Sequence, residues 1–273
     1  MNEFNKAALL NSAKRINVSY FKEQQEDAIN AIWQWWQSSS ITFTLSGYAG
    51  TGKTFIMRHL VRYLITEKVC VTAPTHKALR VLENSSGRKG MTIQSLCGLR
   101  PEVDVEDYDI ENPSFKVIGE QKMRSYKLVV IDECSMINPG LFTLLVKTAI
   151  QCRCKLLFLG DELQIPFVVK KTHGDTDTMH NRISPTFTHT DHQFRLTQIV
   201  RQEVGNPLLE LFGIIRSDLI NGTQNFYQYI INHREEVNAA GEGFTILNKF
   251  DFRNKVIAVS YTHLRAHETL MNL

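Results

Sequence analysis

One short glycine-rich segment constrains the fold of this 273-residue chain more than any other feature of its sequence. Residues 47–54 read Gly-Tyr-Ala-Gly-Thr-Gly-Lys-Thr and match the phosphate-binding pattern G-x-x-x-x-G-K-[ST] at every position. The apolar run 41–45 before it predicts a buried strand, and residues 53–65 after it predict a helix. A strand, this loop and a helix in that order favour a phosphate site over a simple glycine turn, because N–H groups at a helix N-terminus bind anions.

The loop assigns a role to each of its residues in binding ATP and Mg²⁺. Backbone N–H groups would close on the phosphates, the Lys53 ammonium would reach the β- and γ-phosphate oxygens, and the Thr54 hydroxyl would bind Mg²⁺. The predicted nucleotide-contacting residues of the loop are Gly47, Ala49, Gly50, Thr51, Gly52, Lys53 and Thr54.

Composition narrows the class of protein. The length allows one full α/β domain and part of another, and the net charge of +3 is only weak support for a nucleic-acid partner. No apolar run reaches 18 residues, and the N-terminus is too polar for a secretory signal, so we expect no membrane span. Five cysteines without repeated C-x-x-C pairs predict reduced thiols and a cytoplasmic location.

Short apolar strands alternate with helices over residues 41–159 and predict an α/β fold with a parallel sheet covered on both faces. A preceding helix, residues 24–36, places Trp33 and Trp36 on its apolar face, where core packing is favoured over stacking on bases. The expected strands are 41–46, 68–72, 127–131 and 155–159, and the expected helices are 53–65, 75–84 and 138–150.

Two segments interrupt the alternation. Residues 100–126 are rich in acids and prolines and predict an inserted loop or hairpin, and residues 170–193 predict a long surface connection. Beyond residue 201 the pattern restarts with helices near 206–220 and 224–233 and strands near 244–248 and 255–260.

Acidic residues follow one of the apolar strands. Asp132, at the carboxyl end of strand 127–131, would hold Mg²⁺ through water, and Glu133 would polarise the water that attacks the γ-phosphate. Residues 160–166 follow the next strand, where Gly160 permits a tight turn and Gln164 would reach the γ-phosphate or its attacking water. Taken alone, this second segment fits a purely structural turn equally well.

Together with Ala73-Pro74-Thr75-His76-Lys77 after strand 68–72, these segments resemble the motifs of superfamily 1 DNA helicases of the 5′→3′, RecD/Dda-like branch. The resemblance covers nearly the whole chain from about residue 21 and implies a RecA-like P-loop NTPase fold. It implies an ATP-binding domain 1A, a small inserted 1B pin hairpin and the incomplete start of domain 2A. Their expected ranges are 1–99 with 127–197, 100–126, and 198–273, respectively.

The resemblance also implies residue roles outside the phosphate loop. Gln25 stands where the family reads the adenine base, and Arg201 stands where it places a γ-phosphate finger. Phe115 falls at the aromatic wedge of the pin, although an aromatic residue of this hairpin would equally pack on the domain. The residues expected along single-stranded DNA are Pro74, Thr75, His76, Thr92 and Ser95, with a capping or packing role as the alternative for His76.

These implications lead to one expected function and two alternatives. We expect the N-terminal motor portion of an ATP-dependent DNA helicase, a 5′→3′ translocase on single-stranded and fork DNA in replication, recombination or repair. Such a protein would be a monomer in the cytoplasm of a bacterial or phage-infected cell, with replication or recombination proteins as partners. The alternatives are a truncated nucleotide- and single-strand-binding module and an unrelated RecA-like ATPase. Helicase motifs V and VI have no match after residue 202, and we expect the tail from about residue 259 to be non-native.

Overall fold

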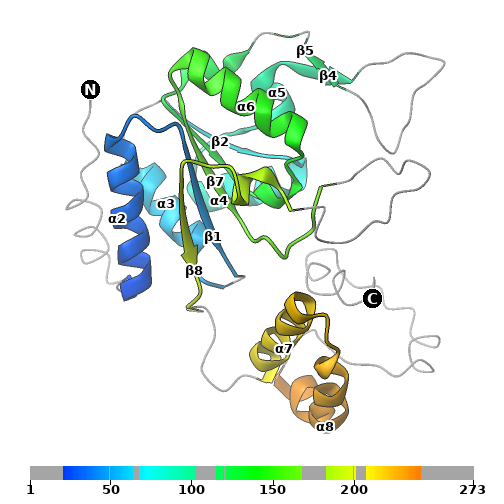
Figure 1. Ribbon diagram of the computed structural model, residues 1–273. Coiled ribbons are helices and arrows are strands. Elements are labelled where there is room, and N and C mark those ends of the chain that lie inside the picture. The colour runs from blue at the N-terminus through cyan, green and yellow to red at the C-terminus, as the bar shows by residue number, and fades with distance from the viewer. Residues whose placement is uncertain are drawn as a thin grey trace, which may run out of the picture. The chain divides into compact units, whose positions relative to one another are not determined.

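The computed structural model describes residues 21–48, 50–63, 68–101, 115–117, 119, 121–167, 183–198, 200 and 207–240 (Figure 1). The chain divides into two compact units, residues 1–201 (unit 1) and residues 202–273 (unit 2), which are taken separately below. The strands expected near 244–248 and 255–260 and the tail from about residue 259 lie outside the described residues. The assignment to domains 1A, 1B and 2A stays a prediction.

Unit 1 is built on a six-stranded sheet in the order β3-β2-β6-β7-β1-β8. Every neighbouring pair in it is parallel, so the prediction of a parallel α/β sheet is confirmed. The strands are β1 (Thr42–Gly47), β2 (Val69–Ala73), β3 (Met91–Thr92), β6 (Leu128–Ile131), β7 (Lys155–Gly160) and β8 (His192–Leu196).

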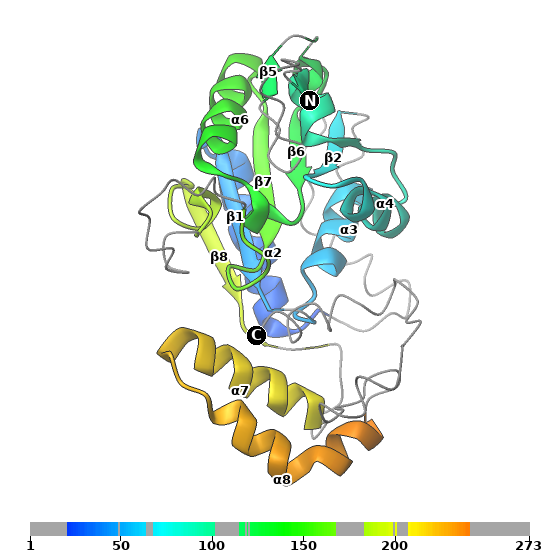
Figure 2. The ribbon, with the colours of Figure 1, turned by 90° about the vertical axis from the view of Figure 1, so that its right-hand side faces the viewer.

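Helices cover both faces of the sheet (Figure 2). Successive residues of a strand point to opposite faces, so each strand contributes side chains to both sides. Leu157 and Leu159 of β7 belong to one hydrophobic cluster, and Leu156 and Phe158 to another. The first cluster contains side chains of α2 (Glu23–Gln37), α3 (Lys53–Tyr63) and α4 (His76–Ser86), and the second contains those of α5 (Ile93–Cys97) and α6 (Pro139–Cys152). Each fully buried Leu or Phe contributes about 1.5–3 kcal/mol to folding.

The apolar face of α2 differs in detail from the prediction. Trp35, rather than Trp33 or Trp36, is fully buried, and the other two tryptophans are only partly buried against the same cluster. The Lys155 ammonium lies 5.0 Å from the Trp35 ring centroid and donates to the Trp35 carbonyl at 3.1 Å. Core packing is therefore the observed role of this tryptophan.

The expected surface connection 170–193 is wrong at residues 184–187, which are buried, whereas Thr188, His189 and Asp191 are exposed as expected. Ser184 and Thr186, on either side of Pro185 in the 3-10 helix η4 (Pro185–Phe187), are 1% and 0% exposed. Their hydroxyls donate to the carbonyls of Ile137 (2.7 Å) and Cys134 (3.2 Å). Polar residues are tolerated in this buried position because their hydrogen bonds are made within the protein.

An antiparallel pair stands where an inserted loop or hairpin was expected. Strand β4 (Leu99–Pro101) pairs with β5 (Phe115–Val117), with Pro101 opposite Phe115. Residues 102–114 and the Phe115 side chain lie outside what the structure describes, so the wedge role of Phe115 stays a prediction. The following 3-10 helix η1 (Lys122–Ser125) buries Met123 in the second core cluster.

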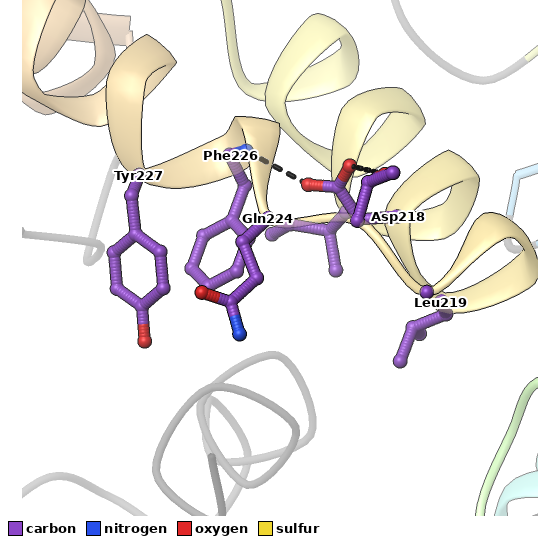
Figure 3. Close-up of a pocket in the computed structure, with 8 residues that line it drawn as sticks. Asp218, Leu219, Gln224, Phe226 and Tyr227 are labelled. Carbon is purple, nitrogen blue, oxygen red and sulfur yellow. Dashed lines mark hydrogen bonds between the residues drawn. The ribbon is translucent and has the colours of Figure 1, made fainter.

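Unit 2 is described as a pair of helices, α7 (Pro207–Asn221) and α8 (Asn225–Ala240). Asp218 organises the turn between them. Its carboxylate accepts from the Asn225 side chain at 3.0 Å. It also accepts from Phe226 N at 2.8 Å (Figure 3). Next to this turn is an open cavity of about 310 Å³. Among the described residues, no helix is long and apolar enough to cross a membrane.

Candidate active site

The phosphate loop joins β1 to α3 at the carboxyl edge of the sheet. The Lys53 side chain folds back over this loop, and its ammonium donates to the carbonyl oxygens of Gly47 (2.5 Å) and Tyr48 (3.0 Å). The Thr51 hydroxyl donates to the Tyr48 carbonyl at 2.8 Å and closes the turn. Thr54 is exposed in the first turn of α3. The Lys53 ammonium therefore lies at the loop, bonded to two of its carbonyl oxygens.

Glycine is required at position 52 for two independent reasons. Its φ of +93° lies where other residues are strained, and a Cβ there would overlap the side-chain nitrogen of Gln25. That nitrogen donates to the Thr51 carbonyl at 3.2 Å, while Gln25 Oε1 accepts from Lys22 N at 3.1 Å. Gln25 is only 4% exposed, and its observed role is this contact with the phosphate loop. The adenine-reading role of Gln25 stays a prediction.

Three acidic residues lie after strands at the same edge of the sheet as Lys53. Burial lowers the pKa of Lys53, and the charges of Asp161, Asp132 and Glu133 oppose that shift. Asp132 and Glu133 follow β6, and Asp161 follows β7, which pairs with β1 through Ser46 and Gly160. Because the carboxyl ends of parallel strands meet at one edge of the sheet, the lysine and the acids come together, while their catalytic roles stay predictions.

Glu133 has an unusual backbone. Its φ of 55° and ψ of 41° place a non-glycine residue in the left-handed region, at a cost of roughly 1–2 kcal/mol. Asp132 Oδ1 accepts from Glu133 N at 2.9 Å, and Met136 N donates to the Glu133 carbonyl at 3.1 Å, which hold this turn. Strained backbone of this kind concentrates at functional sites, in agreement with the role predicted for Glu133.

Asp161 was not among the predicted site residues, although its charge opposes the lowering of the Lys53 pKa by burial. It is 8% exposed, its Oδ1 accepts from Leu163 N at 3.1 Å, and its carbonyl accepts from Gln164 N at 3.1 Å. The predicted turn after Gly160 is therefore present, and Gln164 is half-buried within it. The signal that could have found Asp161 is its place directly after a strand adjacent to the phosphate loop.

The residues expected to contact DNA lie on two adjacent strand ends. Thr92, the last residue of β3, pairs with Ala73, the last residue of β2, so the segments after them start side by side. The Thr75 hydroxyl caps α4 by accepting from Ala78 N at 3.2 Å, and the Thr92 hydroxyl caps α5 by accepting from Ser95 N at 3.3 Å. Both hydroxyls can still donate to a phosphate oxygen.

The remaining predicted residues at this edge are placed as follows. Pro74 is half-buried, and His76 is the exposed first residue of α4, so the cap is Thr75 and not His76. The Lys122 ammonium lies 3.4 Å from Ser95 Oγ and adds a positive charge beside this edge. Ala49 and Arg201 fall outside the described residues, and nothing about their predicted roles is tested.

The donor set fits a metal held jointly by protein and phosphate. Within the described ranges no group of three or more His, Cys, Asp or Glu side chains could hold a metal by itself. Mg²⁺ bound with nucleotides uses one or two protein oxygens together with phosphate oxygens and water. The Thr54 hydroxyl and the Asp132 carboxylate are oxygen ligands of the required type.

A family described as "AAA domain" matches residues 21–217, which include the phosphate loop and all the acids above. The chain belongs to this AAA domain family. This AAA domain is 29% identical over 215 residues to the ATP-dependent DNA helicase dda of Enterobacteria phage T4, covering 77% of the chain and 45% of the relative. It is 30% identical over 169 residues to the ATP-dependent RecD2 DNA helicase of Deinococcus radiodurans, covering 61% of the chain and 20% of the relative.

Solved structures agree with the fold of this AAA domain. The Pif1 helicase from Bacteroides in complex with ADP-AlF3 and single-stranded DNA superposes with a TM-score of 0.51 at 22% identity, covering 74% of this chain and 49% of that one. At this identity the likeness shows the RecA-like P-loop fold alone. The resemblance to RecD/Dda-like superfamily 1 helicases is confirmed, and the chain spans less than half the length of the curated relatives it matches.

Proposed function

We propose that this AAA domain is the N-terminal motor portion of an ATP-dependent DNA helicase that moves 5′→3′ on single-stranded DNA and opens forked duplexes. The observation that carries the proposal is the placement of Lys53, Asp132 and Glu133 after the carboxyl ends of β1 and β6, which both pair in parallel with β7. Its curated relatives are named ATP-dependent DNA helicases, and the Bacteroides Pif1 structure contains single-stranded DNA, which supports the same assignment.

Each residue at the edge would contribute one part of the hydrolysis. Lys53 would bind the β- and γ-phosphate oxygens, and the loop N–H groups would orient the phosphate chain. Glu133, held by its turn, would accept a proton from the attacking water, while Gln164 and Arg201 would contact the γ-phosphate. Thr54 and Asp132 would hold Mg²⁺, which when bound neutralises charge on the phosphate oxygens.

DNA would lie along the adjacent strand ends of β2 and β3. Hydroxyl donors at Thr75, Thr92 and Ser95 would contact backbone phosphates, which carry little base information and suit a motor that acts on any sequence. A movement of the phosphate loop that depends on the bound nucleotide would then be transmitted to the DNA strand.

The test measures ATP hydrolysis with and without single-stranded DNA, and displacement of strands from 5′- and 3′-tailed duplexes. Lys53→Ala should abolish hydrolysis and leave weak DNA binding, whereas Lys147→Ala, which removes an exposed lysine of α6, should match the parent chain. DNA-stimulated hydrolysis that persists in Lys53→Ala would refute the proposal. Nucleotide and DNA binding without strand displacement would instead favour the binding-module alternative for this polypeptide.

A further inference from the structure

The Gln24 side chain, at the start of α2, forms hydrogen bonds with Thr197, a residue 173 positions later in the sequence. Gln24 Oε1 accepts from the backbone N–H groups of Thr197 (2.9 Å) and Gln198 (2.7 Å). Gln24 Nε2 donates to the Thr197 hydroxyl at 2.9 Å. These three hydrogen bonds, called here the Gln24 clasp, fix the chain where it leaves β8.

The clasped segment forms one wall of the phosphate loop. Strand β8 pairs with β1 as far as Leu196 opposite Gly47, and two residues beyond the clasp Val200 N donates to the Gly50 carbonyl at 3.0 Å. The Val200 side chain also closes on the loop, because a Cβ at Gly52 would lie 3.4 Å from Val200 Cγ2. Leu196 and Val200 thus both contact the loop, and residues 196–198 with residue 200 are called the wall below.

The first turn of α2 therefore holds the phosphate loop by two routes. Gln25 donates a hydrogen bond directly to the Thr51 carbonyl of the loop. Gln24 accepts from Gln198 N, two residues before Val200, which contacts the loop. The two N–H groups at residues 197 and 198 lie beyond the last β1–β8 pair, Gly47 with Leu196. Thr197 and Gln198 are exposed, so water could accept hydrogen bonds from their N–H groups if the clasp were absent. The main effect of the clasp is therefore to fix the position of these two residues, because the net number of hydrogen bonds changes little.

We propose that Gln24 is a positioning residue for nucleotide binding: it keeps the wall, residues 196–198 and 200, against the phosphate loop and thereby sets the affinity for a nucleoside triphosphate. The inference rests on the proposed function, since it takes the loop as the nucleotide site. Losing the clasp should free the wall, so that nucleotide binding has to order it again. The expected loss is about tenfold in affinity, the size that corresponds to ordering the backbone of about one residue again when the nucleotide binds.

The experiment compares dissociation constants of a fluorescent ATP analogue, with Mg²⁺ present, for the parent chain and four variants. Gln24→Ala removes the clasp, and Gln24→Glu keeps an acceptor for both N–H groups. Gln34→Ala is the matched control, because Gln34 is an exposed glutamine of the same helix. Lys53→Ala tests the phosphate site itself. Thermal unfolding followed by circular dichroism shows whether each variant is folded, and Thr197→Val, which removes only the hydroxyl arm, replaces Gln24→Ala if that variant is not.

The inference expects Gln24→Ala to bind about tenfold more weakly, Gln24→Glu within about threefold of the parent, and Gln34→Ala like the parent. If Gln24→Ala binds as tightly as Gln34→Ala while Lys53→Ala loses binding, the role of Gln24 is overturned and the proposed function stands. Equal weakening in Gln24→Ala and Gln24→Glu overturns it too, because glutamate retains the acceptor. Unchanged binding by Lys53→Ala overturns the proposed function and this inference with it.

Discussion

Replacing Gly52 by alanine tests how tightly the phosphate loop is packed, and Gly87→Ala provides a matched comparison. Gly87, the C-cap of α4, has a φ of +69° and open space around its missing Cβ, so alanine there meets only backbone strain. Forcing an ordinary residue into the left-handed region costs roughly 1–2 kcal/mol, partly offset by the lower chain entropy of unfolded alanine. We expect a net loss of about 1 kcal/mol for Gly87→Ala.

Gly52→Ala should lose considerably more. Its φ of +93° brings at least the same strain, and its Cβ would displace the Gln25 side chain, which makes hydrogen bonds to Thr51 and Lys22. Each of those bonds contributes roughly 0.5–1.5 kcal/mol, so the expected total is about 2–4 kcal/mol. With a urea dependence of roughly 2–3 kcal/mol per molar, the midpoint should fall about 0.5–1 M further than in Gly87→Ala.

Tryptophan fluorescence during urea unfolding provides the measurement. All three tryptophans lie in α2 at residues 33, 35 and 36, so the signal reports unit 1 alone. Equal midpoints for Gly52→Ala and Gly87→Ala, with equal slopes, would show that the contact between residue 52 and Gln25 does not matter. The packing described for the loop would then be wrong.

Three further results are expected. Burial raises the pKa of four thiols, Cys70, Cys97, Cys134 and Cys154, to about 12. We therefore expect only the half-buried Cys152 to react quickly with a thiol reagent before denaturation. A second thiol that reacts quickly would contradict the packing. Burial alone would raise the pKa of Asp191, but hydrogen bonds from Thr42 and Ile41 hold it below 3.8, so its stabilising contribution is present above that pH and lost as pH falls through the lowered pKa. Urea midpoints between about pH 6 and about pH 3 should therefore fall more steeply for the parent than for Asp191→Asn, and parallel curves would contradict this. Asp218→Ala should reduce helical circular dichroism from unit 2 and leave the tryptophan fluorescence unchanged, whereas a shifted tryptophan signal would place the effect in unit 1.

The buried strands were predictable from the sequence because both faces of the sheet are covered. A strand of this kind reads as a continuous apolar run, and β7 was expected at residues 155–159 and is found at Lys155–Gly160. Strand β8 was missed as a strand. Its residues read His-Gln-Phe-Arg-Leu and are mostly exposed, because it is an edge strand with one strand neighbour, β1. Pairing with β1, rather than its own composition, makes this segment a strand.

The same distinction holds for the candidate site. Lys53, Asp132 and Glu133 were predicted because each follows or belongs to a local pattern that ends a strand. Gln24 was not, because its partners Thr197 and Gln198 are brought to it by the position of β8 in the sheet. Asp161 was not, although it also follows a strand directly, because a turn after Gly160 fits a purely structural role equally well. Thr75 and Thr92 turned out to be helix caps, a local role that a Thr before a helix commonly has and that does not prevent a phosphate contact.

The position of β1 between β7 and β8 has a consequence for how the protein is made. Strand β1, the first described strand in chain order, acquires its two strand neighbours from residues 155–196, so the phosphate loop lacks both flanking strands until most of unit 1 has been synthesised. Nascent chains stalled before residue 192 should therefore contain a glycine-rich turn that cannot yet retain nucleotide. Competence to bind ATP would arise late and abruptly during translation.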